Sequence, residues 1–124
     1  MNASHTLRIL IVEDEPVTSM AMKRFLEFEG HQVSVAASEE EAVTESRSLK
    51  PNVVVSDWKL RDGDDGLTVA RRLQSEYHPS IIMVTAHRLE KVRARARDMG
   101  LEIAAFRRKP VSLAHLAELL EEVV

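Results

Sequence analysis

Several features are missing from this sequence, and each absence excludes a class of protein. None of the 124 residues is cysteine, which excludes a disulfide framework, thiol chemistry and a thiolate metal site. No apolar run approaches the length of a membrane span, and the N-terminal MNASHTLR lacks the pattern of a signal peptide. The formal net charge is only -3, which gives no electrostatic argument for binding nucleic acid or membrane. A soluble, cytoplasmic protein is therefore expected.

The composition is that of a globular domain, with 44% hydrophobic and 30% charged residues. A chain of this length can bury one sizeable core. The sequence contains no linker, repeat or low-complexity stretch. We therefore expect residues 1–124 to form a single domain.

Short apolar runs alternate with amphipathic stretches along the chain. The apolar runs are typical of strands covered on both faces and span 7–12, 32–36, 52–57, 80–85 and 102–106. The spacing of apolar residues predicts helices over 16–29, 38–49, 65–77 and 87–99, and a last helix that Ser112 opens. Five βα units in succession predict an α/β fold, a doubly wound parallel sheet with helices on both faces.

The ends and faces of the helices have their own signals. Pro16 suits a first helical turn, and Gly30 is a plausible stop for that helix. Ser38 with Glu41 three residues later is a capping box at the start of the second helix. The predicted apolar face of the first helix comprises Val17, Ala21, Phe25 and Phe28.

Carboxylate, hydroxyl and ammonium groups follow the predicted strands at the points where they end. Glu13 and Asp14 follow the first strand, Asp57 ends the third, Thr85 ends the fourth, and Lys109 follows the fifth. The carboxyl ends of parallel strands share one edge of an open sheet, which is where such folds place their sites. We therefore expect these five side chains to meet.

The three carboxylates indicate a metal ion. Glu13, Asp14 and Asp57 crowded together would repel one another, and a hard divalent ion such as Mg²⁺ relieves that repulsion. In the alternative interpretation, Asp14 and Glu15 cap the first helix, and Asp57 caps a turn.

Thr85 and Lys109 supply what a phosphorylated carboxylate needs. The hydroxyl and the ammonium can both hold oxygens of an incoming phosphoryl group, while Asp57 acts as a nucleophile and forms an acyl phosphate. Each residue also has a simpler interpretation. Thr85 suits a strand because it is β-branched, and Lys109 can be a solvated surface cation.

With these residues the sequence resembles the receiver domain of response regulators, the CheY-like family of two-component signalling, over essentially its whole length. An acidic pair, a phosphoacceptor Asp, a Thr or Ser, and a Lys recur in that order in the family. The matching residues here are Glu13 and Asp14, Asp57, Thr85, and Lys109 followed by Pro110. The resemblance implies a flavodoxin-like (βα)5 fold with strand order 2-1-3-4-5.

The resemblance also implies the site's partners and cofactor. Asp57 would accept a phosphoryl group from a histidine kinase or a phosphotransfer protein, with no enzyme activity beyond its own phosphorylation and dephosphorylation. Mg²⁺ would bind Asp14, Asp57 and the backbone carbonyl of Lys59, with Glu13 as a ligand directly or through a water. The downstream target or output domain is not indicated.

An aromatic switch is implied as well. In the family an aromatic ring lies three residues before the Lys, and Phe106 matches it here. This ring is expected to turn into the space that Thr85 leaves when the phosphate draws it inward. Core packing is the other interpretation of Phe106.

The loop after Asp57, WKLRDGDDG, departs from the family pattern. Arg61 occupies the position where Pro is common, and Gly66 falls nine rather than eight residues after Asp57. These departures leave the flexibility of the loop open. Lys59 and His87 flank the expected phosphoryl group and either control the access of water or are merely exposed polar residues.

Two predicted helices carry opposite charges. The fourth is rich in cations and the last carries Glu118, Glu121 and Glu122. The hypothesis is a homodimer, favoured by phosphorylation, through the face of helix 4, strand 5 and helix 5. No helix-turn-helix pattern follows, so direct DNA binding is not expected.

Two other functions compete with the phosphorylation switch. The first is a receiver-like protein interaction module that is not phosphorylated, against which the complete set of site residues argues. The second is an enzyme of flavodoxin or phosphohydrolase type. Glu13-Asp14-Glu15 would repel a flavin phosphate, and a phosphatase would need more chain to build a substrate cap.

Overall fold

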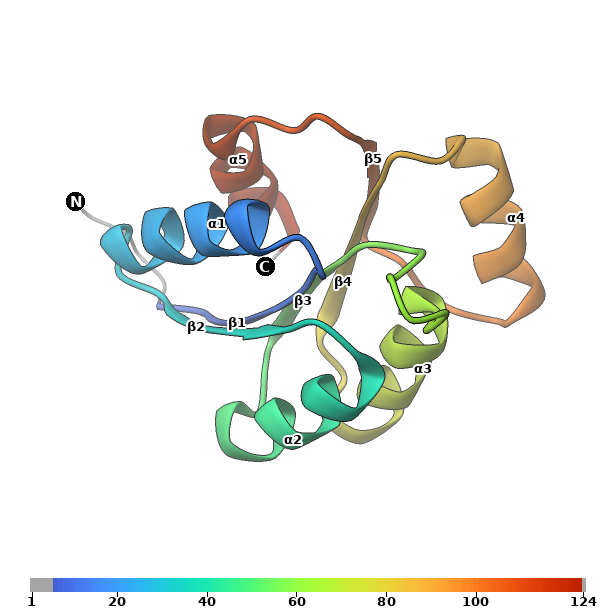
Figure 1. Cartoon of the computed structure of the whole chain (residues 1–124), viewed down its shortest axis with the longest axis horizontal. Helices are drawn as coiled ribbons and strands as arrows, with labels where there is room; N and C mark the ends of the chain where they lie inside the picture. The colour runs from blue at the N-terminus through green and yellow to red at the C-terminus, as the bar shows by residue number, and fades with distance from the viewer. Residues whose placement is uncertain (1–5, 124) are drawn as a thin grey trace.

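The strands and helices follow the hydrophobic pattern of the chain closely. The computed structural model describes residues 6–123 and shows strands alternating with helices along the sequence (Figure 1). The elements are β1 (Arg8–Val12), α1 (Pro16–Phe28), β2 (Gln32–Ala36), α2 (Glu39–Leu49), β3 (Val53–Ser56), α3 (Gly66–Tyr77), β4 (Ser80–Thr85), α4 (Leu89–Asp98), β5 (Ala105–Arg108) and α5 (Leu113–Val123).

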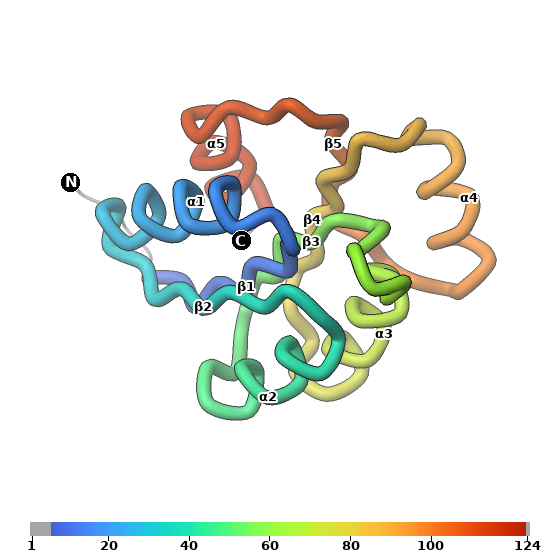
Figure 2. Tube along the Cα trace, viewed as in Figure 1, coloured from blue at the N-terminus to red at the C-terminus, as the bar shows by residue number. Residues whose placement is uncertain are grey.

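The strands form one parallel sheet in the order β2-β1-β3-β4-β5. This confirms the predicted doubly wound α/β fold and the strand order. β1 and β3 are direct neighbours, with Val12 opposite Ser56, so the chain leaves both strands side by side (Figure 2). The residues that follow these two strands therefore meet at one edge of the sheet.

The helices divide between the two faces of the sheet. α1 and α5 cover one face, and α2, α3 and α4 cover the other (Figure 1). Side chains that alternate along each strand supply the two cores. Ile9 and Ile11 of β1 pack toward α1 and α5, whereas Leu10 belongs to the cluster with α3 and α4. Burial on both faces explains why the strand sequences are continuously apolar.

Two predicted helix starts are confirmed by their hydrogen bonds. The backbone N–H of Glu41 donates to Ser38 Oγ at 3.2 Å, and the Glu41 carboxylate accepts from the N–H of Ala37 at 2.8 Å. The backbone N–H of His115 donates to Ser112 Oγ at 3.0 Å. Both hydroxyls satisfy amides that the helix itself leaves free.

The prediction for the fifth strand was displaced along the sequence. The expected run, 102–106, begins too early, because β5 starts at Ala105 and continues to Arg108. Leu101 and Ile103 are apolar because their side chains pack against the core from the segment before the strand. Charged residues are tolerated in β5 because it is an edge strand.

The predicted buried face of α1 was wrong at three of its four residues. Val17 and Phe28 are 77% and 86% exposed and Ala21 is exposed too, whereas Ser19 and Leu26 are buried. Phe25 is the one predicted residue that packs against the core, beside Met22 and Leu26. Val17, Met20 and Phe28 are therefore left on the outside of the helix.

None of the helices within residues 6–123 combines the length and apolarity that a membrane span requires.

Candidate functional site

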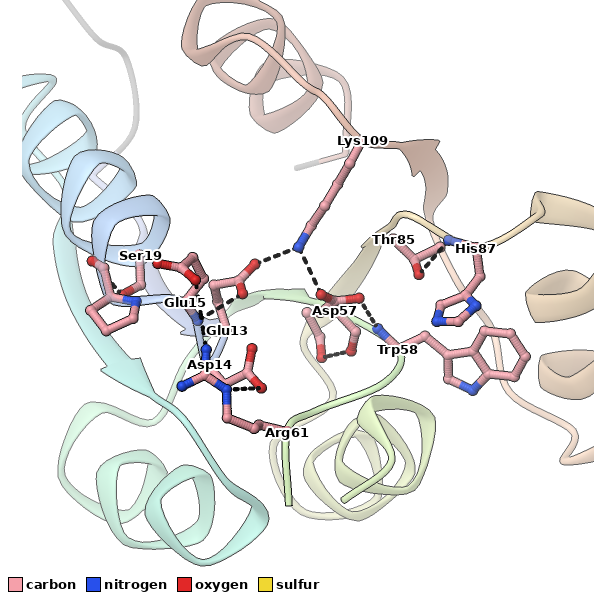
Figure 3. Close-up of polar contacts among 12 residues, drawn as sticks. Glu13, Asp14, Glu15, Ser19, Asp57, Trp58, Arg61, Thr85, His87 and Lys109 are labelled. Carbon is pink, nitrogen blue, oxygen red and sulfur yellow. Dashed lines mark hydrogen bonds and ion pairs between the residues drawn. The ribbon is translucent and has the colours of Figure 1, made fainter. Parts of the chain in front are cut away.

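The carboxyl edge of the sheet brings together three of the five side chains that the sequence predicted to meet: Glu13, Asp57 and Lys109. Backbone hydrogen bonds extend the sheet just beyond the strands: Asp57 N–H donates to Val12 O at 3.0 Å, and Lys109 N–H donates to Thr85 O at 2.9 Å. These bonds fix the backbones from which Asp57 and Lys109 project. Figure 3 shows the two side chains pointing toward each other, with Glu13 beside them.

Lys109 joins two carboxylates of the site, the buried Glu13 and the partly buried Asp57. Its Nζ donates to Asp57 Oδ2 at 2.7 Å and to Glu13 Oε1 at 2.8 Å (Figure 3). Burial lowers the pKa of Lys109, but the hydrogen bonds and negative charges of Asp57 and Glu13 outweigh burial and hold that pKa above its usual 10.5. Lys109 is therefore a permanent cation of the site, which rules out the solvated surface cation of the alternative interpretation.

Asp57 is half-buried, and both of its oxygens accept hydrogen bonds. Oδ1 accepts from the backbone N–H of Trp58 at 2.7 Å, and Oδ2 accepts from Lys109. The side chain is 12% exposed, so it can be reached from solvent. The cap at the start of α3 is Asp65, whose carboxylate accepts from Leu67 N–H and Thr68 N–H. Asp57 therefore does not serve as the cap of that helix.

The acidic residues after β1 do not cap α1. Glu15 is the N-cap residue, but its side chain makes no capping hydrogen bond. Glu13 turns inward, where Oε2 accepts from Glu15 N–H at 3.0 Å and Oε1 accepts from Lys109. Asp14 lies beside Arg61, with Arg61 Nε 4.0 Å from Asp14 Oδ2. The three acidic side chains thus face cations and the site rather than the end of the helix.

Thr85 is fully buried at the end of β4. Its hydroxyl accepts a hydrogen bond from His87 N–H at 3.2 Å, and among residues 6–123 it makes none with Asp57. Phe106 is opposite Met83 in the β4–β5 pair and is partly buried, with the Arg93 guanidinium 5.4 Å from the centre of its ring. Thr85 and Phe106 thus lie on neighbouring strands, and their role as a switch stays a prediction.

The loop between β3 and α3 is folded back on itself. Trp58 and Leu60 are buried in the core, and Lys59 and Asp65 form an antiparallel bridge across the loop. Gly66 lies so close to Asp57 that an added Cβ would overlap Asp57 O. The longer loop, whose flexibility the sequence left open, is thus anchored at both ends.

The side chains of Lys59 and His87, the two residues expected to flank the phosphoryl group, both contact the ring of Trp58. The Lys59 ammonium lies 4.3 Å from the centre of the Trp58 ring, and the His87 ring packs edge-on against it at 5.5 Å. Figure 3 shows the Trp58 and His87 rings together on the Thr85 side of Asp57. Lys59 and His87 are both exposed residues, as their simpler interpretation requires.

The side chains do not enclose a metal ion by themselves. Within residues 6–123 no group of three or more His, Asp or Glu side chains is arranged to hold one. In the predicted ligand set Asp14, Asp57 and the backbone carbonyl of Lys59 bind Mg²⁺, and Glu13 binds it directly or through a water. The close grouping of all three carboxylates that the sequence predicted is not found among the described residues. With Glu13 acting through a water, the set needs only two carboxylates as direct ligands, because Mg²⁺ keeps several waters.

One participant was missed by the sequence reasoning. Arg61 was noted only as a departure from a pattern, yet it contacts both Asp14 and Glu15. The sequence did offer a signal. Arg61 is a cation in the loop after β3, and that loop starts at the same edge of the sheet as the three consecutive acids Glu13, Asp14 and Glu15. Among the predicted residues, Glu13, Asp57 and Lys109 are joined by direct contacts. The other four contact different neighbours: Asp14 lies beside Arg61, Thr85 beside His87, Lys59 beside Trp58 and Phe106 beside Arg93.

Comparison with known proteins gives a consistent result. A family model described as the response regulator receiver domain matches residues 9–121. The chain is 35% identical over 120 residues to the positive alginate biosynthesis regulatory protein of Pseudomonas aeruginosa, covering 94% of this chain and 46% of that protein. It is 33% identical over 118 residues to the transcriptional regulatory protein PdtaR of Mycobacterium tuberculosis, covering 94% of this chain and 56% of the relative. The chain therefore spans about half the length of these relatives.

Solved structures agree with the fold. The receiver domain protein (CheY-like) of Methanospirillum hungatei superposes with a TM-score of 0.82 at 28% sequence identity, covering 95% of this chain and 93% of that one. The strand order and the helices on both faces are thus shared with a solved structure of similar size.

Proposed function

The chain belongs to the response-regulator receiver family of two-component signalling, and from this premise we propose that Asp57 is its phosphoacceptor. The observation that carries the proposal is the double contact of Lys109, which places one cation on both Asp57 and Glu13 at the carboxyl edge of the sheet. The functional unit is proposed to comprise residues 1–124.

The proposed chemistry is transfer of a phosphoryl group from a phosphohistidine to Asp57. A carboxylate oxygen attacks phosphorus, the P–N bond breaks with its electrons returning to the imidazole, and the new P–O bond gives an acyl phosphate. Lys109 lies on Asp57 and offsets the charge of the phosphoryl oxygens. The Thr85 hydroxyl accepts from His87 N–H, so it keeps its own proton to donate to a phosphoryl oxygen.

Mg²⁺ is the proposed cofactor. Asp14, Asp57 and the backbone carbonyl of Lys59 would hold it, with Glu13 as a ligand directly or through a water. These are oxygen donors only, and two carboxylates with one carbonyl leave positions for water and a phosphoryl oxygen, as Mg²⁺ prefers. Support comes from the cations that already lie on these carboxylates, Lys109 and Arg61. When bound, the ion supplies charge neutralisation for the transferring phosphoryl group.

The proposed partners are a histidine kinase or phosphotransfer protein and an output protein or domain of unknown identity. Val17, Met20 and Phe28 are large apolar side chains exposed on α1, and exposed apolar side chains of this size are available to a protein partner. The output is proposed to follow from inward movement of Thr85 and rotation of Phe106, which change the face of α4, β5 and α5. Phe106 supports this role because its ring lies against Arg93 of α4.

The test is phosphorylation by a small donor. Wild type, Asp57→Asn and Asp62→Asn are incubated with acetyl phosphate and Mg²⁺ and examined by intact mass and by Trp58 fluorescence. One phosphoryl adduct is expected on wild type and on Asp62→Asn, which alters an exposed carboxylate in the same loop, and none on Asp57→Asn. Removal of Mg²⁺ with EDTA should suppress the adduct.

An adduct that persists in Asp57→Asn would assign the phosphoacceptor to another residue. Absence of an adduct from all three proteins would favour the interaction module that is not phosphorylated. The same samples test the proposed homodimer, which predicts faster sedimentation of the phosphorylated wild type. An unchanged sedimentation coefficient would remove the dimer without affecting the role of Asp57.

A further inference from the structure

Arg61 projects from the tip of an anchored turn. Gly63 N–H donates to Leu60 O at 3.2 Å, and Leu60 N–H donates to Asp64 O at 3.0 Å. Trp58 and Leu60, which lie between β3 and Arg61, are buried in the core and anchor the chain just before the turn. The backbone of Arg61 is therefore fixed, although its side chain is 66% exposed.

The Arg61 guanidinium lies on the carboxylates that Lys109 leaves unpaired. Nε is 4.0 Å from Asp14 Oδ2, and Nη2 is 3.6 Å from Glu15 Oε2. Figure 3 shows Lys109 approaching the acidic group from one side and Arg61 approaching it from the other. Lys109 thus pairs with Glu13 and Asp57, whereas Arg61 pairs with Asp14 and Glu15. Asp14, a proposed Mg²⁺ ligand, is therefore the carboxylate that Arg61 and the ion would share.

We propose that Arg61 competes with Mg²⁺ for Asp14 and thereby weakens metal binding at the phosphorylation site. The inference rests on the proposed function, because it requires Asp14 to be a metal ligand. Direct coordination by Asp14 removes its carboxylate from the guanidinium. The contact with Glu15 keeps the displaced guanidinium near Asp14, where its charge repels the ion.

The size of the effect follows from the exposure of the pair. Exposed ion pairs of this length are weak, so releasing Asp14 from Arg61 changes the Mg²⁺ dissociation constant by about two- to fivefold. Such a change does not abolish Mg²⁺ binding. The contact with Arg61 raises the Mg²⁺ concentration at which the site of the wild type is half occupied. Arg61 is thus a residue that sets the metal affinity rather than a catalytic residue.

The experiment compares two arginine variants of the full chain. Wild type, Arg61→Gln and Arg72→Gln are titrated with MgCl₂ at constant ionic strength, with Trp58 fluorescence and calorimetry as readouts. Arg72 is the matched control, since it is also an exposed arginine in an ion pair, with Glu39 at 3.2 Å, and its loss changes the net charge equally. Arg61→Gln is expected to bind Mg²⁺ two- to fivefold more tightly than wild type, and Arg72→Gln equally to wild type.

Equal affinities for Arg61→Gln and wild type would overturn the proposal. So would a gain of the same size in Arg72→Gln, because it would reflect net charge alone. In an Asp14→Asn background the gain from Arg61→Gln should shrink or vanish, and an undiminished gain would refute competition at Asp14.

Failure of this inference is distinguishable from failure of the proposed function. If wild type forms the Asp57 adduct and binds Mg²⁺ but Arg61→Gln changes neither, only the role of Arg61 is wrong. If no variant binds Mg²⁺ and wild type forms no adduct on Asp57, the phosphoacceptor proposal fails and the competition at Asp14 fails with it.

Discussion

At the scale of single residues, Gly66 determines whether the loop after β3 can pack closely against Asp57, the proposed phosphoacceptor. The backbone of Gly66 lies against Asp57 and donates to Trp58 O, and an added Cβ would be 2.8 Å from Ser56 Oγ as well as overlapping Asp57 O. The carbonyl group of Asp57 cannot move aside without disturbing the end of β3, because Asp57 N–H is hydrogen-bonded to Val12 O of β1. The backbone therefore leaves no room for a side chain at this position.

Gly66→Ala is expected to lower the free energy of unfolding by about 1–3 kcal/mol, as overpacking generally does. It should also reduce labelling by acetyl phosphate, because the new methyl group displaces Asp57. Urea unfolding and intact mass measure the two effects. Gly100→Ala is the control, since nothing lies within 4 Å of its added Cβ. Its positive φ of 71° is unfavourable for alanine, so this variant should be less stable than wild type but should be labelled normally. Normal labelling of Gly66→Ala would contradict the close approach.

At the scale of secondary structure elements, Lys109 ties the ends of three strands together. It follows β5, while its partners Glu13 and Asp57 follow β1 and β3. Removing the ammonium leaves two carboxylates facing each other without a cation. In metal-free buffer, Lys109→Met is therefore expected to lose about 1–3 kcal/mol of stability.

The measurement is urea unfolding of Lys109→Met in EDTA and in Mg²⁺. A bound divalent ion should restore part of the lost stability, because it replaces the missing positive charge. Lys91→Met, which removes an exposed cation from α4, should unfold like wild type in both buffers. An equal loss of stability in EDTA and Mg²⁺ would argue against metal binding by these carboxylates.

The elements also show what the sequence could and could not predict. The order of strands and helices and the meeting of Glu13, Asp57 and Lys109 were predictable, because buried strands have apolar sequences and end at one edge. The buried face of α1 was not, since its apolar residues lie on two sides and only packing selects one. The contacts of Arg61 were not predictable either, because they depend on how the loop folds.

At the scale of the whole molecule, His31 makes stability depend on pH. Its Nδ1 accepts a hydrogen bond from Leu7 N–H at 3.0 Å, at the opposite end of β1 from the proposed phosphorylation site. Burial lowers the pKa of His31 from 6.5, against the opposing charges of Glu29 and Glu121. Below pH 6.5 the unfolded chain thus binds more protons than the folded one, so stability is lost as the pH falls.

The corresponding prediction concerns His31→Gln, which keeps a hydrogen-bond acceptor but cannot be protonated in this range. Between pH 7.5 and about 5.5, the urea midpoint of wild type should fall more steeply than that of the variant. Parallel pH profiles for the two proteins would show that His31 does not contribute to the pH dependence.

The contacts of Lys109 also have a consequence for folding. Its hydrogen bonds to Asp57 and Glu13 close chain separations of 52 and 96 residues. Contacts of such long range form only after most of the intervening chain has been ordered. A folding intermediate that lacks β5 can contain the acidic residues but cannot place the ammonium between them. Competence to accept a phosphoryl group should therefore be among the last properties that the folding chain acquires, after most of its secondary structure has formed.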